Sequence, residues 1–231
     1  MKPFCFSLSG IYESEGYAWE QAGKIWDLRE LRGTDGYLDP ETEQFLEAEL
    51  GRKKETKELP RIRLLDSGNY HYMTRIWLEK ISEPFELLVF DNHTDMQPPA
   101  FGGLLSCGGW IYDSVMELPL LKRVILIGPD EEAFSRVEPE FKEKVEFLSR
   151  ERLLEMEETE VSAFVKNQVG EYPLYISIDK DVLCEADADT NWSQGDMRLS
   201  TMLECLGAVK EKCAERISRI LGVDICGECD V

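Results

Sequence analysis

An apolar run that ends abruptly in acidic residues constrains this chain more than any other feature. Residues 87–90 read Leu-Leu-Val-Phe, and Asp91, His93 and Asp95 follow at every second position. Four consecutive apolar residues between polar neighbours predict a strand that is buried on both faces, as in a parallel sheet. Ligands of such sheets bind beyond the carboxyl ends of the strands, so we expect these three side chains to point into a site. A chance histidine in an acidic loop is the alternative for this stretch taken alone.

A second strand pattern ends in the same way. Residues 174–178 read Leu-Tyr-Ile-Ser-Ile, and Asp179 and Asp181 follow. A third predicted strand, residues 62–65, precedes a loop that reaches His71 just before a helical pattern. Both histidines of the chain therefore follow predicted strands, and this repetition favours a built site over chance.

The combined residues have the chemistry of a site for two divalent cations. Carboxylate oxygens and imidazole nitrogens are typical ligands of such ions, and four carboxylates balance the charge of two dications. Burying the four carboxylates without cations would be costly, and their pKa values would have to rise. The predicted metal ligands are His71, Asp91, His93, Asp95, Asp179 and Asp181.

The composition predicts a single soluble domain over residues 1–231, with 43% hydrophobic and 31% charged residues. Lysine and arginine number 26 against 46 aspartates and glutamates, which gives a net charge of −20. Such a field repels nucleic acid and anionic membranes, so we expect neither as a partner. It permits a cationic substrate and metal ions, although acidic surfaces most often serve solubility.

The cysteines predict a cytoplasmic location. Seven cysteines, an odd number, are scattered without a disulfide framework, which favours a reducing compartment. The first ten residues contain too few apolar side chains for a signal peptide, and no apolar segment is long enough to span a membrane. Cys226 and Cys229 form a Cys-x-x-Cys pair that we interpret as incidental, with a reversible disulfide as the alternative.

Strand and helix patterns alternate along the chain, which predicts an α/β fold with a parallel sheet and helices on both faces. Residues 26–38 read as a loop, and a helix begins at Pro40 and stops at Gly51. The strands are predicted at 2–8, 62–65, 85–90, 123–127, 145–148, 174–178 and 217–225. The further helices are predicted at 73–80, 111–118, 150–169 and 199–214.

The acidic motifs resemble those of the ureohydrolases, the family of arginase and agmatinase. Asp91-Asn-His93-Thr-Asp95 resembles their Asp-Ala-His-x-Asp motif, and Ser177-Ile-Asp179-Lys-Asp181 resembles their Ser-x-Asp-x-Asp motif. Gly68-Asn-Tyr-His71 is similar to their Gly-Gly-x-His segment. The resemblance covers residues 60–228 and implies an arginase-like three-layer α/β/α sandwich around a central parallel sheet.

The resemblance also implies how the ligands divide between two Mn²⁺ ions per chain, with other divalent cations left open. One ion would be held by His71, Asp91, Asp95 and Asp179, and the other by His93, Asp91, Asp179 and Asp181. Asp91 and Asp179 would then bridge the ions. A shared water with a lowered pKa would attack a planar amidino or guanidino carbon.

The chain departs from the family pattern at several positions. It has no third histidine to move protons, and Leu183-Cys-Glu stands where many relatives have Asp-Pro. A family glutamate that pairs with the guanidinium corresponds to Glu228 only with a shift of one position, and we name Glu228 and Asp95 as catalytic residues. Asn191 and Trp192 occupy the region of a substrate-facing loop and are the predicted substrate contacts.

Three functions are therefore compared. The first is a binuclear manganese-dependent hydrolase of a guanidino- or amidino-type linear C–N bond in a small cationic substrate, as in arginase, agmatinase or formimidoylglutamase. The second is a zinc-dependent deacylase of an acylated amine, whose pair of histidines beside the zinc this chain lacks. The third is a metal-binding relative without activity. The resemblance also implies assembly into a homo-oligomer, since members of the family commonly form trimers or hexamers.

Overall fold

The strands of this protein form one parallel sheet. The computed structural model describes residues 3–14, 24–55, 61–99, 103–215 and 219–229, and within them eight strands pair in the order β2-β1-β3-β8-β7-β4-β5-β6. Every pairing between named strands is parallel. The strands are β1 (Phe4–Ser7), β2 (Lys24–Asp27), β3 (Ile62–Leu64), β4 (Phe85–Phe90), β5 (Leu121–Ile127), β6 (Val145–Leu148), β7 (Leu174–Asp179) and β8 (Ile220–Cys226).

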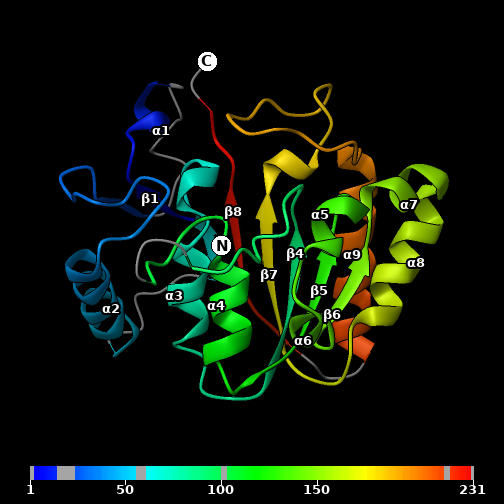
Figure 1. Ribbon diagram of the computed structural model, residues 1–231, viewed down its shortest axis with the longest axis horizontal. Helices are drawn as coiled ribbons and strands as arrows, with labels where there is room; N and C mark the ends of the chain where they lie inside the picture. Colours follow the sequence, from blue (N-terminus) through cyan, green and yellow to red (C-terminus); the bar gives the residue numbers. More distant parts are fainter. Residues whose placement is uncertain (1–2, 15–23, 56–60, 100–102, 216–218, 230–231) are drawn as a thin grey trace.

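Helices cover both faces of the sheet, as the sequence predicted (Figure 1). Leu87 and Val89 of β4 pack in a core half with α2, α3 and α4, whereas Leu88 and Phe90 pack with α8 and α9. This alternation explains why residues 87–90 of β4 are all apolar: each face of the strand contacts its own layer of helices. The helices are α1 (Ile11–Ser14), α2 (Pro40–Glu55), α3 (Met73–Leu78), α4 (Trp110–Glu117), α5 (Glu131–Ser135), α6 (Pro139–Lys142), α7 (Arg150–Glu155), α8 (Glu158–Gln168) and α9 (Leu199–Glu215).

Three sequence-based expectations are wrong in detail. Strand β2 (Lys24–Asp27) was not predicted, and its last two residues lie in the region 26–38 predicted as a loop, because a short, exposed edge strand has no buried pattern to reveal it. Helix α2 continues past Gly51, since a helix interior tolerates glycine at a cost of about 1 kcal/mol. The helix predicted over 150–169 is two helices, because Met156 is extended and Glu157 begins α8 with a capping box.

Parts of two other expectations fall outside the described residues, namely residue 2 of the strand predicted at 2–8 and residues 217–218 of the strand predicted at 217–225. No helix in the described ranges is both long and apolar enough to span a bilayer. The neighbouring strands β8, β7 and β4 bring their carboxyl ends to one edge of the sheet, where the loops after them meet.

Candidate metal centre

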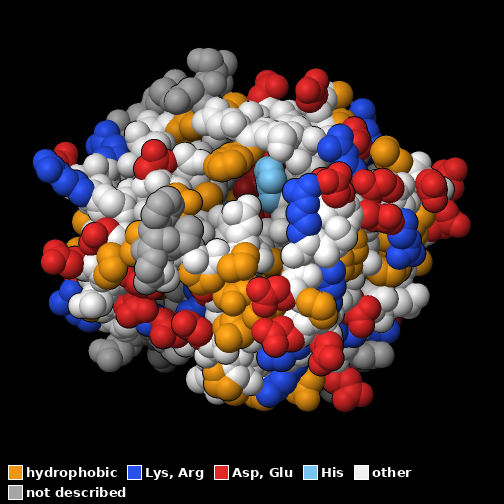
Figure 2. All heavy atoms as spheres, in the orientation of Figure 1, with side chains coloured by type: hydrophobic (Ala, Val, Ile, Leu, Met, Phe, Trp, Pro, Cys, Tyr) orange, Lys and Arg blue, Asp and Glu red, His pale blue; other side chains and the backbone are white. Residues whose placement is uncertain are grey.

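All six predicted metal ligands come together at this edge of the sheet. Asp91 follows β4 directly, and Asp179 ends β7. Asp181 lies in the short 3-10 helix η2 (Lys180–Val182), and His71 follows the 3-10 helix η1 (Gly68–Tyr70). A cavity of about 310 Å³ opens here, and Figure 2 shows a histidine side chain beside the hollow on this face.

One group of ligands surrounds His71. Its Nδ1 lies 3.2 Å from Asp91 Oδ2, 3.1 Å from Asp95 Oδ2 and 3.6 Å from Asp179 Oδ2. All four side chains are buried. The donor atoms of His71, Asp91 and Asp95 lie close enough together to share one cation.

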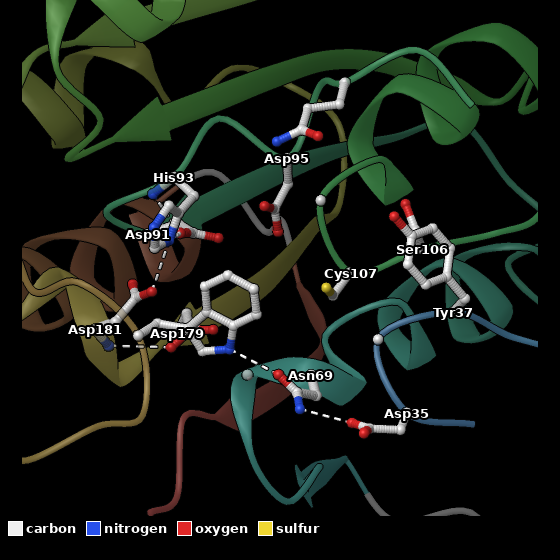
Figure 3. Close-up of a pocket in the computed structure, with 15 residues that line it drawn as sticks. Asp35, Tyr37, Asn69, Asp91, His93, Asp95, Ser106, Cys107, Asp179 and Asp181 are labelled. Carbon is white, nitrogen blue, oxygen red and sulfur yellow. Dashed lines mark hydrogen bonds and ion pairs between the residues drawn. The ribbon is translucent and has the colours of Figure 1, made fainter. Parts of the chain in front are cut away.

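A second group surrounds His93. Its Nδ1 lies 2.8 Å from Asp181 Oδ2 and 3.6 Å from Asp91 Oδ1 (Figure 3). The donor atoms of Asp91, His93 and Asp181 also lie close enough to share a cation. Asp91 therefore contributes one carboxylate oxygen to each group, which is the arrangement of a bridging ligand.

A serine hydroxyl holds the far nitrogen of each imidazole. His71 Nε2 lies 2.9 Å from Ser177 Oγ, and His93 Nε2 lies 2.9 Å from Ser193 Oγ. The Ser177 hydroxyl donates its hydrogen to Asp224 Oδ1 at 2.5 Å, so the ring of His71 must donate to Ser177. When this ring is neutral, its proton is on Nε2 and the lone pair of Nδ1 faces the carboxylates, as a metal ligand requires.

The contact to His71 is the end of a longer buried network. Arg63 Nη1 donates to the Tyr175 hydroxyl at 2.8 Å, and this hydroxyl donates to Asp224 Oδ2 at 2.7 Å. Both oxygens of Asp224 are thus engaged, one by Tyr175 and the other by Ser177. The network links strands β3, β7 and β8 to the ring of His71 and fixes the orientation of that ring.

Asp95 is held by the start of α4. Its backbone has a positive φ of 47°, which is unusual for an aspartate. The N–H groups of Ile111 and Tyr112 donate to its carbonyl oxygen, and Trp110 Nε1 donates to its Oδ2 at 2.6 Å. These contacts offset the backbone strain and direct the carboxylate toward His71.

Two buried polar atoms in the first group lack hydrogen bonds. Among the described residues, neither His71 Nδ1 nor Asp91 Oδ2 has a hydrogen-bond partner, although the two atoms are 3.2 Å apart. Buried polar atoms are nearly always paired, so such a pair needs an explanation. A cation between them would satisfy both, and the oxygen and nitrogen donors suit a divalent ion such as manganese.

The pKa shifts indicate that several groups of the centre hold protons when no cation is bound. Burial and the charge of Asp91 raise the pKa of Asp95 to about 7. Burial and the charges of Asp179 and Asp91 raise the pKa of Asp181 to about 8. Burial would lower the pKa of His93, but the contacts with Asp181 and Asp91 raise it to about 11. Without cations, the centre therefore keeps protons that metal ions would displace.

Asp179 sits nearer to the first group than to the second. Its Oδ1 accepts a hydrogen bond from the backbone N–H of Asp181 at 3.0 Å, and its Oδ2 is the oxygen that faces His71. The grouping around His93 does not include it among the described residues. The predicted bridging role of Asp179 therefore remains a prediction, whereas Asp91 has the geometry of a bridge.

Of the two residues predicted to contact substrate, Trp192 and Asn191, only Trp192 is among the described residues that line the cavity. Trp192 lines the cavity, and its ring lies 5.6 Å from that of His93. Its Nε1 donates to Asn69 Oδ1 at 2.8 Å. Asn191 is exposed and is not among the cavity-lining residues. Glu228 also lies outside the lining and forms an ion pair with Lys180, so its catalytic role remains a prediction.

The sequence did not reveal the opposite wall of the cavity. Asp35 and Tyr37 lie there, away from His93 (Figure 3), and Asn69 donates to Asp35 Oδ1 at 2.6 Å. These residues come from a loop between β2 and α2 that carries no motif. Only the tertiary fold brings this loop to the sheet edge. Gly36 and Gln97 are the other lining residues that the sequence missed, and the loop residues Ser106, Cys107 and Gly108 also line the cavity.

This chain is similar to known proteins in sequence and in fold. Residues 71–225 match the model of the Arginase family. An uncharacterised protein of Thermotoga maritima is 32% identical over 191 residues, which cover 83% of this chain and 63% of that protein. The chain thus spans less than two thirds of the length of this relative.

Two solved structures share the fold. A hypothetical agmatinase from Burkholderia thailandensis superposes with a TM-score of 0.68 at 16% identity, and the match covers 99% of this chain and 78% of that one. Proclavaminate amidino hydrolase from Streptomyces clavuligerus superposes with a TM-score of 0.70 at 16% identity, over 98% of this chain and 83% of that one. These likenesses establish the predicted three-layer architecture.

Proposed function

We propose that this chain, which belongs to the arginase family, is a binuclear manganese-dependent hydrolase of a guanidino- or amidino-type C–N bond. The observation that carries the proposal is the pair of histidine–carboxylate groups that share Asp91. The unpaired buried atoms His71 Nδ1 and Asp91 Oδ2 support a cation between them. Cytoplasmic location and assembly into a homo-oligomer remain expectations beside it.

The ligand roles follow from the two groups. His71, Asp91 and Asp95 would hold one ion, and Asp91, His93 and Asp181 the other, with Asp179 beside the first. When bound, two manganese ions supply Lewis acidity and activate water as a nucleophile at neutral pH. Ser177 and Ser193 keep each imidazole turned toward its carboxylates, so the ligands need little reorganisation.

The cavity favours a small cationic substrate. Within the part of the chain that the structure describes, the charged residues that line it, apart from His93, are all acidic: Asp35, Asp91, Asp95, Asp179 and Asp181. Its volume of about 310 Å³ suits a small molecule. Trp192 offers a flat indole face for a planar cation. Asp35 on the opposite wall gives a second positive group of the substrate an anionic partner.

The predicted catalytic residues differ in support. Asp95 lines the cavity and accepts a hydrogen bond from Trp110, which keeps it oriented beside His71. Glu228 would have to leave Lys180 before it could contact a guanidinium. We therefore assign Asp95 to the reacting end of the cavity and retain Glu228 only as a test position.

A substrate screen tests the proposal. Guanidino, amidino and formimino compounds would be assayed with protein reloaded with manganese, and we expect turnover of at least one. Asp181→Asn should abolish it, whereas Glu185→Gln, the same change of charge at an exposed position outside the cavity lining, should not. Turnover of acetylated lysine or polyamines with one zinc ion would instead identify a deacylase. Two bound ions without any turnover would identify a metal-binding relative without activity.

A further inference from the structure

A buried thiol lies against the first ligand group. Cys226 is the last residue of β8 and is fully buried. It stands beside Asp179 in the pairing of β7 with β8, and its Sγ donates to Asp179 Oδ2 at 3.1 Å. The oxygen that Cys226 contacts is the same one that faces His71.

The backbone after Cys226 allows this approach. Gly227 has a φ of +94°, and a Cβ at this position would lie 2.6 Å from Asp179 Oδ1. Its N–H donates to the carbonyl oxygen of Asp66, so the chain turns directly after the strand. Glycine at this position therefore avoids a clash with Asp179 and permits the turn directly after the strand.

The three side chains have the spacing of metal ligands. Donor atoms of His71, Asp179 and Cys226 all lie within 4.8 Å of one another, and all three residues are buried. Ligands bound to one ion at about 2.0–2.3 Å each are separated by up to about 4.6 Å, and Asp179 Oδ2 lies 3.1 Å from Cys226 Sγ, within that limit. Nδ1 of His71 lies 3.6 Å from Asp179 Oδ2 and has no hydrogen-bond partner among the described residues, so a ligand atom is available there.

We propose that Cys226 is a sulfur ligand of the ion held by His71 and that the two metal positions therefore differ in preference. The inference rests on the proposed binuclear centre and revises the manganese expectation at one position. A thiolate favours softer ions such as Zn²⁺, Fe²⁺ or Co²⁺. Among the described residues, the position at His93 has only oxygen and nitrogen donors and keeps the preference for Mn²⁺. The thiol proton passes to solvent when sulfur coordinates the ion.

Cobalt spectroscopy tests the assignment directly. We expect cobalt-loaded protein to show a near-ultraviolet sulfur-to-cobalt charge-transfer band. Cys226→Ser should lose the band, and Cys107→Ser, which removes a thiol that lines the cavity, should keep it. Competition between cobalt and manganese, read by metal mass spectrometry, should show the cobalt preference of Cys226→Ser reduced about tenfold or more.

The outcomes separate this inference from the proposed function. Identical cobalt spectra for the wild-type protein and Cys226→Ser, with metal bound to both, would overturn the sulfur ligand and leave the binuclear centre standing. A wild-type protein that binds no divalent ion would overturn both. Cys226→Ala serves as the second variant if serine disturbs folding, and it should lose the band in the same way.

Discussion

Removing the hydroxyl of Ser177 should weaken metal binding without touching a ligand. Ser177 is fully buried, and its Oγ contacts His71 Nε2 at 2.9 Å, Asp224 Oδ1 at 2.5 Å and Thr74 Oγ1 at 3.3 Å. Ser177→Ala leaves the ring of His71 without the partner that fixes its orientation. Loss of such a partner typically costs about 10- to 100-fold in metal affinity, or about 1.4 to 2.7 kcal/mol.

The same change has a separate effect on the metal-free fold. Asp224 Oδ1 loses its donor, whereas Oδ2 keeps the hydrogen bond from Tyr175. A buried acceptor left without a partner costs about 1–3 kcal/mol of unfolding free energy. Urea unfolding in the presence of a chelator measures this cost, and titration of the folded metal-free protein with manganese measures the loss of affinity.

Ser193→Ala is the matched control because Ser193 holds His93 in the same way but is exposed. We expect Ser193→Ala to weaken the binding of the ion at His93 while leaving the unfolding free energy within about 0.5 kcal/mol of the wild-type value. A Ser177→Ala protein that binds manganese as tightly as the wild-type protein would refute the orienting role of Ser177. Equal losses of stability in both variants would refute the argument from burial.

Three further perturbations probe the charge, the cavity and the core. Asp95 and Asp181 have folded pKa values raised to about 7 and about 8, so the metal-free protein holds protons that the unfolded chain releases near about pH 4. Its melting temperature in chelator should therefore fall as the pH rises from about 4 to 8, and Asp181→Asn should flatten this decline; a stability that rises over this range would contradict the shifts. Asp35→Asn should raise KM for a dicationic substrate about fivefold with kcat unchanged, and an unchanged KM would remove Asp35 from recognition. Leu88→Ala in β4 should cost about 2–5 kcal/mol in urea unfolding, whereas Leu154→Ala, 65% exposed, should stay within about 0.5 kcal/mol; similar costs would contradict the two-layer core.

The sequence carried enough information for the central strands and the groups at their ends. The strand predicted at 85–90 coincides with β4, because the apolar run of residues 87–90 is what a strand buried on both faces requires. Acidic residues directly after such strands then have only one edge of the sheet at which to lie. The sequence therefore predicts that Asp91 and Asp181 meet at one edge of the sheet, and the loop after the strand predicted at 62–65 adds His71.

Other parts of the centre depend on strand register and on loops. Ser177 belongs to a recognisable motif, but its bond to Asp224 exists only because the two residues are paired across β7 and β8. The contact of Cys226 with Asp179 also depends on the pairing of β7 with β8, so the sequence alone does not indicate a role for this cysteine. Asp35 reaches the cavity on a loop whose path no local pattern specifies.

Metal content of the wild-type protein and three variants tests the shared-ligand centre most directly. After reloading with manganese and removal of free ion, mass spectrometry should find one ion for each of the two histidine groups in the wild-type protein. Asp91→Ala should lose both ions, because Asp91 belongs to both groups, whereas Asp95→Ala and Asp181→Ala should each lose one. Wild-type protein without metal, or Asp91→Ala with full metal content, would contradict a binuclear centre built around Asp91.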